Sequence, residues 1–319
     1  FDETKLAGGF TIYAGCCIRK LDIICFHNQL LLKTPRLPTI IKKNMSTNQM
    51  QMPPFMYGTA WKKEKTKELV ELAVRSGFRG VDTACQPKHY HEPGVGEALQ
   101  ALFAENIITR GEIFLQTKFT SLNGQDPNRI PYNPKSTFDE QVRQSFDASL
   151  RNLRTDYVDS FVLHGPLHRF VDTMLVWRTM EELYDTGKVR QIGISNTYDI
   201  SMLRQLYDEA RVKPTVLQNR FYSDTGYDKE IREFCAQNNI TYQSFWTLTA
   251  NPHVLKAPLM QQLSRKYRHT PEQLFFSFVR SLGITPLTGS SSPVHLQQDL
   301  AALSLHMDTA DLQALNELL

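Results

Sequence analysis

Four residues whose side chains can together protonate a carbonyl oxygen stand at or just after predicted strands. Asp82 and Lys118 each lie near the end of a strand. His164 ends a third strand, and Tyr90 follows the first of them after a short loop. An ammonium group beside a phenol favours the phenolate and lowers the phenol pKa from about 10, and a carboxylate paired with the ammonium keeps it charged. Such a phenol can donate a proton at neutral pH, and a neutral imidazole can orient the carbonyl.

Each of these residues also has a plainer interpretation, because an acid or a lysine at a strand end often serves as a cap or in a salt bridge. Three polar residues at the ends of consecutive apolar strands favour a shared site instead. The spacing of His89 and His91 suggests a metal, but no third ligand has a convincing spacing, so we predict a loop and no metal site. Cys85 is either a redox thiol or, as we expect, a packed cysteine.

The segments that must position these side chains alternate between strand and helix from residue 55 onward. Strands are predicted at 55–59, 78–84, 113–119, 157–164, 189–195, 215–219, 240–248 and 284–288. Helices are predicted at 64–76, 96–106, 137–153, 171–184, 200–210, 229–238, 257–267, 271–282, 293–303 and 309–318. Strands alternating with helices indicate a parallel sheet with right-handed crossovers, and about eight units in about 250 residues predict an α/β fold, a single-domain (β/α)8 TIM barrel.

A doubly wound open sheet is the structural alternative to this barrel. It usually carries a glycine-rich fingerprint after its first strand, and the sequence has neither GxGxxG nor a P-loop motif at a strand–helix junction. In a barrel the C-terminal ends of all strands open onto one face. Asp82, Lys118 and His164 are therefore expected to meet at one mouth.

Composition excludes several classes of protein. The 319 residues include 36 basic and 33 acidic side chains, a formal net charge of +3 that is too balanced to indicate a nucleic-acid surface. Hydrophobic residues make up 41% and charged residues 22%, which excludes wholesale disorder. No apolar run approaches the about 18 residues of a membrane span. Five cysteines do not make a disulfide framework, so we expect a reducing compartment, the cytoplasm. A monomer is the default expectation, and the charge balance and hydropathy predict no nucleic-acid or membrane partner.

Residues 1–50 are interpreted as an extension outside the main fold, poorly ordered, with the barrel at 51–319. No helical or strand period is sustained there, and Met45 is the first clear start signal. The segment is basic and poor in acids, as in a transit peptide, but it contains Asp2, Glu3 and Asp22 and lacks a clear amphipathic helix. An artefact of the gene model is the favoured explanation.

Seven short motifs in order give the chain from about residue 53 to 305 its resemblance to the aldo-keto reductases. They are Gly58-Thr59-Ala60-Trp61, Gly80-Val81-Asp82-Thr83-Ala84, Val95-Gly96-Glu97-Ala98, Thr117-Lys118, Val162-Leu163-His164, Ile192-Gly193-Ile194-Ser195-Asn196 and Val216-Leu217-Gln218-Asn219. Each motif alone is weak, and their order and spacing make the set specific. The stretch from Asp82 to Tyr90, DTACQPKHY, resembles a fungal branch of the family.

The resemblance implies a nicotinamide-dependent reductase that converts an aldehyde or ketone to an alcohol. By matching position, Tyr90 is the general acid, Lys118 and Asp82 tune it, and His164 orients the carbonyl. The implied cofactor contacts are Gly58, Thr59, Asp82, Ser195, Asn196, Gln218, Phe245, Trp246, Thr288, Ser290 and His295. Among these, the serine, asparagine and glutamine bind the nicotinamide carboxamide, and either aromatic residue stacks on its ring. NADPH is the expected cofactor, with NADH as its alternative.

Three departures from the family pattern affect this interpretation. Tyr90 stands farther from Asp82 than in relatives, with Pro87 in the usual place, so it reaches the site only if the extra residues bulge outward. Leu287-Thr288 and His295 replace basic residues that grip the adenosine 2′-phosphate in the family, which predicts a weak preference for NADPH. Gly165 replaces a frequent tryptophan and suggests room for a bulkier carbonyl. A displaced tyrosine would instead fit a nucleotide-binding regulator or subunit of the same fold with little turnover.

Overall fold

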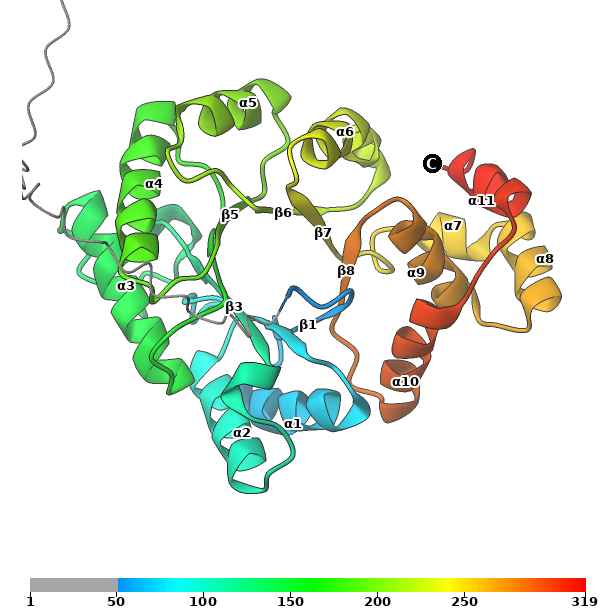
Figure 1. Ribbon diagram of the computed structural model, residues 1–319, viewed down its shortest axis with the longest axis horizontal. Helices are drawn as coiled ribbons and strands as arrows, with labels where there is room; N and C mark the ends of the chain where they lie inside the picture. The colour runs from blue at the N-terminus through cyan, green and yellow to red at the C-terminus, as the bar shows by residue number, and fades with distance from the viewer. Residues whose placement is uncertain (1–50) are drawn as a thin grey trace, which may run out of the picture. The chain divides into compact units, whose positions relative to one another are not determined.

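Eight short strands in residues 51–319, the part of the chain that the computed structural model describes, pair in parallel and in chain order (Figure 1). They are β1 (Met56–Gly58), β2 (Gly80–Asp82), β3 (Phe114–Phe119), β4 (Ser160–Leu163), β5 (Ile192–Ser195), β6 (Val216–Arg220), β7 (Thr241–Phe245) and β8 (Thr285–Thr288). The last strand pairs with the first, so the sheet closes on itself. The predicted (β/α)8 barrel is thus confirmed, and the expectations for residues 1–50 lie outside the described residues.

Helices surround the barrel and connect successive strands on its outside (Figure 1). They are α1 (Thr66–Ser76), α2 (Glu92–Ala104), α3 (Phe138–Leu153), α4 (Phe170–Asp185), α5 (Ile200–Glu209), α6 (Lys229–Gln237), α7 (Pro252–Lys256), α8 (Pro258–Tyr267), α9 (Pro271–Ser281), α10 (Pro293–Ala301) and α11 (Thr309–Asn316). Within residues 51–319, none of them has the length and apolar character needed to cross a bilayer.

Local sequence signals explain where most of these helices begin and end. Gly77 closes α1 with φ of +117°, a left-handed conformation that glycine adopts without strain. Thr270 and Gln273 form a reciprocal capping box at the start of α9. Helix α2 begins four residues earlier than the predicted range 96–106, because Pro93 occupies its first turn, where a missing N–H is tolerated. The five-residue helix α7 was not predicted.

The strands divide their side chains between the barrel interior and the helix layer. In β3, Gln116 and Lys118 contact the Asp82 side chain of β2, whereas Thr117 between them bonds Glu92 at the start of α2. Between sheet and helices the core is apolar, as where Phe146 of α3 packs on Phe161 of β4 with ring centroids 4.9 Å apart. Alternation along β3 therefore directs Gln116 and Lys118 to the interior near the mouth and Thr117 toward the helix layer.

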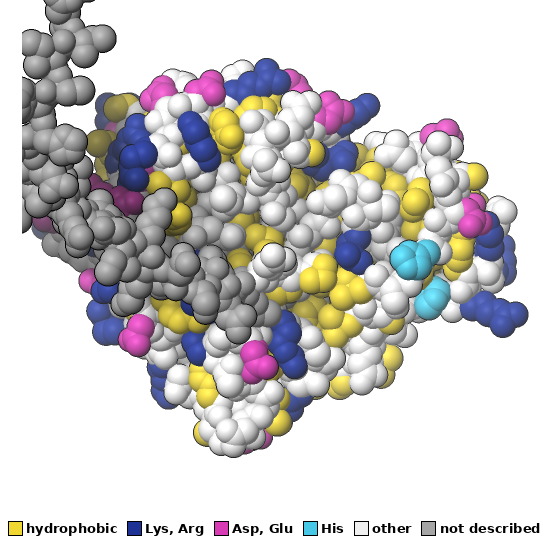
Figure 2. All heavy atoms as spheres, viewed as in Figure 1, with side chains coloured by type: hydrophobic (Ala, Val, Ile, Leu, Met, Phe, Trp, Pro, Cys, Tyr) yellow, Lys and Arg dark blue, Asp and Glu magenta, His cyan; other side chains and the backbone are white. Residues whose placement is uncertain are grey.

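The surface in Figure 2 carries charges of both signs. Basic and acidic side chains are interspersed around the rim of the visible face, and apolar side chains gather toward its centre. This mixture agrees with the small net charge of +3 and offers no extended basic stripe on that face.

Candidate active site

A buried ion pair lies at the mouth of the barrel. Both Asp82 and Lys118 are almost fully buried, and the Lys118 Nζ lies 2.7 Å and 2.6 Å from the two carboxylate oxygens of Asp82. The ammonium also donates to the backbone oxygen of Thr83 at 2.9 Å. Burial lowers the pKa of Lys118, and the charge of Asp82 opposes this effect. The pair therefore offers little net charge to its surroundings.

The loop between β2 and α2 carries Tyr90 back to this pair. A turn at residues 87–89 leaves Lys88 exposed, and the backbone N–H groups of His89 and Tyr90 both bond the Gln86 oxygen, at 3.1 and 3.0 Å. The Gln86 amide donates to the Gly124 oxygen at 2.6 Å. The extra residues thus bulge outward, which is the condition under which Tyr90 reaches the site.

Glu92 anchors the far end of the same loop. This carboxylate is buried and accepts hydrogen bonds from the hydroxyls of Thr117 at 2.5 Å and Ser149 at 2.8 Å, and from the Asn152 amide at 3.1 Å. Burial raises its pKa. Because Thr117 adjoins Lys118 on β3, the loop is fixed to the strand that carries the ammonium group.

Tyr90 is partly buried and lines the cavity beside Lys118 and His164. The Lys118 Nζ lies 5.2 Å from the centroid of its ring, and the His164 ring centroid lies 5.9 Å away. Burial and the negative charge of Asp82 raise the pKa of Tyr90. The expected lowering of this pKa is therefore wrong, because burial disfavours the charged phenolate and Asp82 offsets the charge of the ammonium group.

His164 is held as a neutral imidazole. Burial lowers its pKa well below the usual value, and the charge of Lys118 adds to the effect. Its Nδ1 lies 2.6 Å from the Thr120 hydroxyl, and its backbone oxygen accepts a hydrogen bond from the Asn196 amide at 2.8 Å. The four predicted catalytic residues are thus brought together.

The lowered pKa of His164 makes a pH-dependent contribution to stability. Below about pH 6.5 the unfolded chain binds a proton at this residue more readily than the native state does, so acid favours unfolding. We expect the free energy of unfolding to fall between about pH 7 and pH 5, and to fall less in a His164→Gln variant. Urea titrations of both proteins across this range measure it, and parallel losses would contradict the assignment.

One cavity of about 1210 Å³ runs from these residues across the barrel mouth to β8 and α10. This exceeds the range of about 300–1,000 Å³ that is typical for drug-sized ligands, so the volume suits more than one small molecule. The predicted cofactor residues that line it are Gly58, Asp82, Ser195, Asn196, Gln218, Phe245, Trp246, Thr288, Ser290 and His295. Thr59 does not line the cavity: it is fully buried, and its hydroxyl donates to the backbone oxygen of Asp82 at 3.0 Å.

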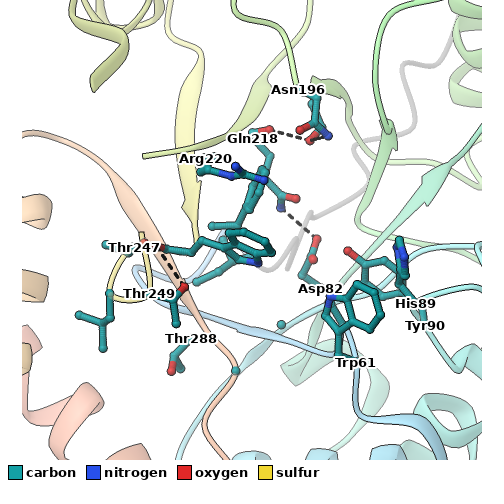
Figure 3. A pocket seen from close by; sticks show the side chains of 18 of the residues that line it. Trp61, Asp82, His89, Tyr90, Asn196, Gln218, Arg220, Thr247, Thr249 and Thr288 are labelled. Carbon is teal, nitrogen blue, oxygen red and sulfur yellow. Dashed lines mark hydrogen bonds between the residues drawn. The ribbon is translucent and has the colours of Figure 1, made fainter. Parts of the chain in front are cut away.

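The inner end of the cavity offers amides and a hydroxyl. The Ser195 hydroxyl donates to the backbone oxygen of Gln218 at 2.6 Å, and Asn196, with φ of +50°, turns its amide toward Ser195 at 3.2 Å. The Gln218 amide donates to Asp82 at 3.0 Å, the dashed line in Figure 3. The donors and acceptors at this end suit a planar carboxamide.

The outer end combines hydroxyls, backbone groups and few charges. Ser292 caps the N-terminus of α10, and the hydroxyls of Thr288 and Ser290 accept backbone N–H groups of the same loop. The Lys62 ammonium donates to the Gly289 oxygen and is a positive charge at this end. Burial raises the pKa of Asp299, which also lines the cavity, to about 6. A loop before a helix N-terminus can bind phosphate groups.

Two exposed tryptophans line the cavity, Trp61, which is labelled in Figure 3, and Trp246. Trp61, 57% exposed, stacks on His89 with ring centroids 4.0 Å apart, and its backbone N–H bonds the His89 oxygen at 2.7 Å. Trp246, 49% exposed, lies under the guanidinium of Arg220 at 4.2 Å and beside Phe245, the last residue of β7. Aromatic side chains therefore line the opening at both of these positions.

Several residues of the site were not among those predicted from the sequence. Gln116 and Gln243 lie in the barrel interior beside Asp82 and Gln218, Thr120 holds His164, and Trp61 flanks the opening. The period of two along a strand would have identified both glutamines, since Gln116 stands two residues before Lys118 and Gln243 two before Phe245. No comparable signal marks Thr120. Residues 51–319 contain no cluster of three or more metal-ligating side chains.

Comparison with known proteins identifies the family. The sequence profile of the aldo/keto reductase family matches residues 52–319. The chain belongs to the aldo/keto reductase family. It is 26% identical over 287 residues to glyoxal reductase of Bacillus subtilis, covering 88% of this chain and 95% of that protein. It is also 26% identical to methylglyoxal reductase DkgA of Yersinia pestis, over 80% of this chain and 84% of that protein.

Solved structures of aldo-keto reductases share this fold. An aldo/keto reductase from Brucella melitensis superposes with a TM-score of 0.71 at 25% identity, covering 85% of this chain and 97% of the other. An aldo-keto reductase crystallised with NADPH, AKR2E5, gives a TM-score of 0.71 at 22% identity over 85% of each chain. The aldo/keto reductase barrel therefore accounts for almost all of the described residues.

Proposed function

We propose that the protein is an NAD(P)H-dependent reductase that converts an aldehyde or ketone to an alcohol. The observation that carries the proposal is the convergence of a phenol, an ion-paired ammonium group and a neutral imidazole at the inner end of one cavity. Membership of the family and the names of the glyoxal and methylglyoxal reductases among its relatives support the reaction class.

Tyr90 acts as the proton donor in this proposal. Its raised pKa keeps the phenol protonated at neutral pH, as a donor must be. Asp82 offsets much of the lysine charge, and the role proposed for the Lys118 ammonium, 5.2 Å from the ring centroid, is to stabilise the phenolate left after transfer. If the Thr120 hydroxyl donates to Nδ1 of His164, the imidazole hydrogen is on Nε2, where it can bond the substrate oxygen. When bound, the reduced nicotinamide supplies the hydride to the carbonyl carbon.

The cavity residues fit a nicotinamide dinucleotide. Asn196 and Gln218 offer amides to the carboxamide, Phe245 or Trp246 offers a ring face, and the loop before α10 offers phosphate-binding groups. We propose NADPH as the preferred reductant, in line with the NADPH complex of a protein with the same fold. Thr288 and His295 supply little fixed charge for a 2′-phosphate, so the preference over NADH is weak.

The substrate is proposed to be a carbonyl compound larger than a small aldehyde. Gly165 lines the cavity, and a Cβ built there would make an ordinary van der Waals contact with the Asn196 Cβ at 3.7 Å, so the lack of a side chain leaves room in the wall at this point. The loop from Asp82 to Tyr90 supports assignment to the fungal branch. The buried free thiols of Cys85 and Cys235 support a reducing compartment such as the cytoplasm. A monomer is proposed as the default state.

The assay follows the loss of NADPH absorbance with glyoxal, methylglyoxal and an aromatic ketone, and repeats it with NADH. We expect oxidation of NADPH with at least one of these carbonyls and slower oxidation of NADH. Tight cofactor binding without turnover on any carbonyl would reject the reductase in favour of a nucleotide-binding regulator. The position of Tyr90 on the cavity supports the enzyme.

A further inference from the structure

Three glutamines form a polar layer across the barrel interior beneath the cavity. Gln116 comes from β3, Gln218 from β6 and Gln243 from β7, and all are buried. The Gln243 Oε1 accepts from the side-chain nitrogens of both other glutamines at 2.8 Å. The Gln243 Nε2 in turn donates to the Gln116 Oε1 at 3.2 Å. Interiors of such barrels are usually filled with branched apolar residues, so this layer departs from the common pattern.

The network determines which way each amide faces. The Asp82 carboxylate, paired with Lys118, can only accept, so the side chain of Gln218 must present its nitrogen to it, at 3.0 Å. The second hydrogen on that nitrogen goes to Gln243. Both donors of Gln218 are therefore used inside the barrel, and its carbonyl oxygen is the atom it can offer to a ligand in the cavity.

Gln243 stabilises this orientation together with Asp82, without touching the cavity itself. It does not line the cavity, and its oxygen is the second acceptor for the Gln218 nitrogen. Gln116 supports Gln243 from the other side and shares the same Asp82 oxygen, at 2.8 Å. A chain of satisfied buried amides resists rotation, because turning one of them leaves several buried groups without partners.

We propose that Gln243 is a positioning residue that holds the carbonyl oxygen of Gln218 toward the cavity, so that this position selects an N–H donor. This inference rests on the proposed function, in which the selected group is the primary amide nitrogen of the nicotinamide carboxamide. A ring substituent with a carbonyl but no N–H would lose this bond. Without Gln243, one of the two Gln218 hydrogens loses its acceptor, so Asp82 alone holds the amide and the carbonyl oxygen is directed less firmly toward the cavity.

The test compares two oxidised cofactors that differ at this group, NADP⁺ and its acetylpyridine analogue, in which a methyl ketone replaces the carboxamide. Isothermal titration calorimetry gives both dissociation constants. One net hydrogen bond corresponds to about fivefold in affinity, so the full-length protein is expected to bind NADP⁺ about fivefold more tightly than the analogue. In Gln243→Met, whose side chain matches glutamine in length, the ratio is expected to fall to about twofold or less.

Two further variants make the result specific. Gln141→Leu removes another buried glutamine, on α3 and away from the cavity, and should keep the wild-type ratio. Gln243→Glu keeps an acceptor oxygen for Gln218 and should restore the ratio, since both cofactors carry the same charge. If Gln243→Met fails to fold, Gln243→Glu and Gln243→Leu are compared instead. The same role is supported if the ratio of the two dissociation constants stays at its wild-type value in Gln243→Glu and is lost in Gln243→Leu.

The outcomes separate this inference from the proposed function. Equal weakening of both cofactors in Gln243→Met, with an unchanged ratio, shows a packing role and overturns the inference. A wild-type protein that binds the two equally also overturns it. Binding of neither cofactor by the wild-type protein rejects the proposed function itself.

Discussion

Replacing Tyr90 with phenylalanine is expected to lower kcat for carbonyl reduction by about a thousandfold, within the range known for loss of a general acid. The ring, and its position 5.2 Å from the Lys118 Nζ, is retained, so only the hydroxyl group is removed. Cofactor affinity should change less than about twofold, because Tyr90 is not among the predicted cofactor contacts. Steady-state assays and a fluorescence titration with NADPH measure the two effects.

Tyr157→Phe is the matched control for this change. Tyr157 precedes β4 at the opposite end of the barrel, where its ring packs between Arg110 and Arg190, and its loss of a hydroxyl should leave kcat unchanged. Full activity in Tyr90→Phe would reassign the acid. His89, which lines the cavity, is then the next candidate, followed by His91.

Replacing Lys118 with methionine is expected to reduce the free energy of unfolding by about 3–5 kcal/mol and to abolish reduction. The change leaves the Asp82 carboxylate buried without its cation, which is the costly way to break a buried ion pair. Adding Asp82→Asn removes the stranded charge. The double variant should therefore regain much of the lost stability while staying inactive.

Urea denaturation of the wild-type, single and double variants measures the stability effect, and the NADPH assay measures the activity. A single variant as stable as the wild type would show that Asp82 is neutralised in another way. Recovery of activity together with stability in the double variant would show that the ammonium group has no part in the chemistry.

The fold was largely predictable because each element carries a local signal. The eight apolar strands, and helices such as α3 with its apolar face, follow from period and caps alone. The start of α2 was placed too late because Pro93 and Gly94 resemble loop residues, although proline is acceptable in a first helical turn. Helix α7 has too few residues for a helical period to appear.

The site was predictable in its residue types but not in its electrostatics. Strand ends and the short loop after the first of them indicated that Asp82, Lys118, His164 and Tyr90 would meet, and the resemblance implied that Tyr90 is the acid. The raised pKa of Tyr90 depends on burial and on how completely Asp82 cancels the lysine charge, and neither is a property of the sequence pattern. The glutamine layer depends on residues from strands far apart in the chain, which only the closed sheet brings together.

The contact between the first two strand–helix loops links the entrance of the cavity to its chemistry. The indole of Trp61 rests on the His89 ring, its peptide N–H bonds the His89 oxygen, and Tyr90 is the next residue. A ligand that displaces this indole is therefore expected to disturb the peptide unit next to Tyr90. In the proposed reductase, the fit of a molecule at the entrance is then expected to affect how the phenol is aligned with the substrate.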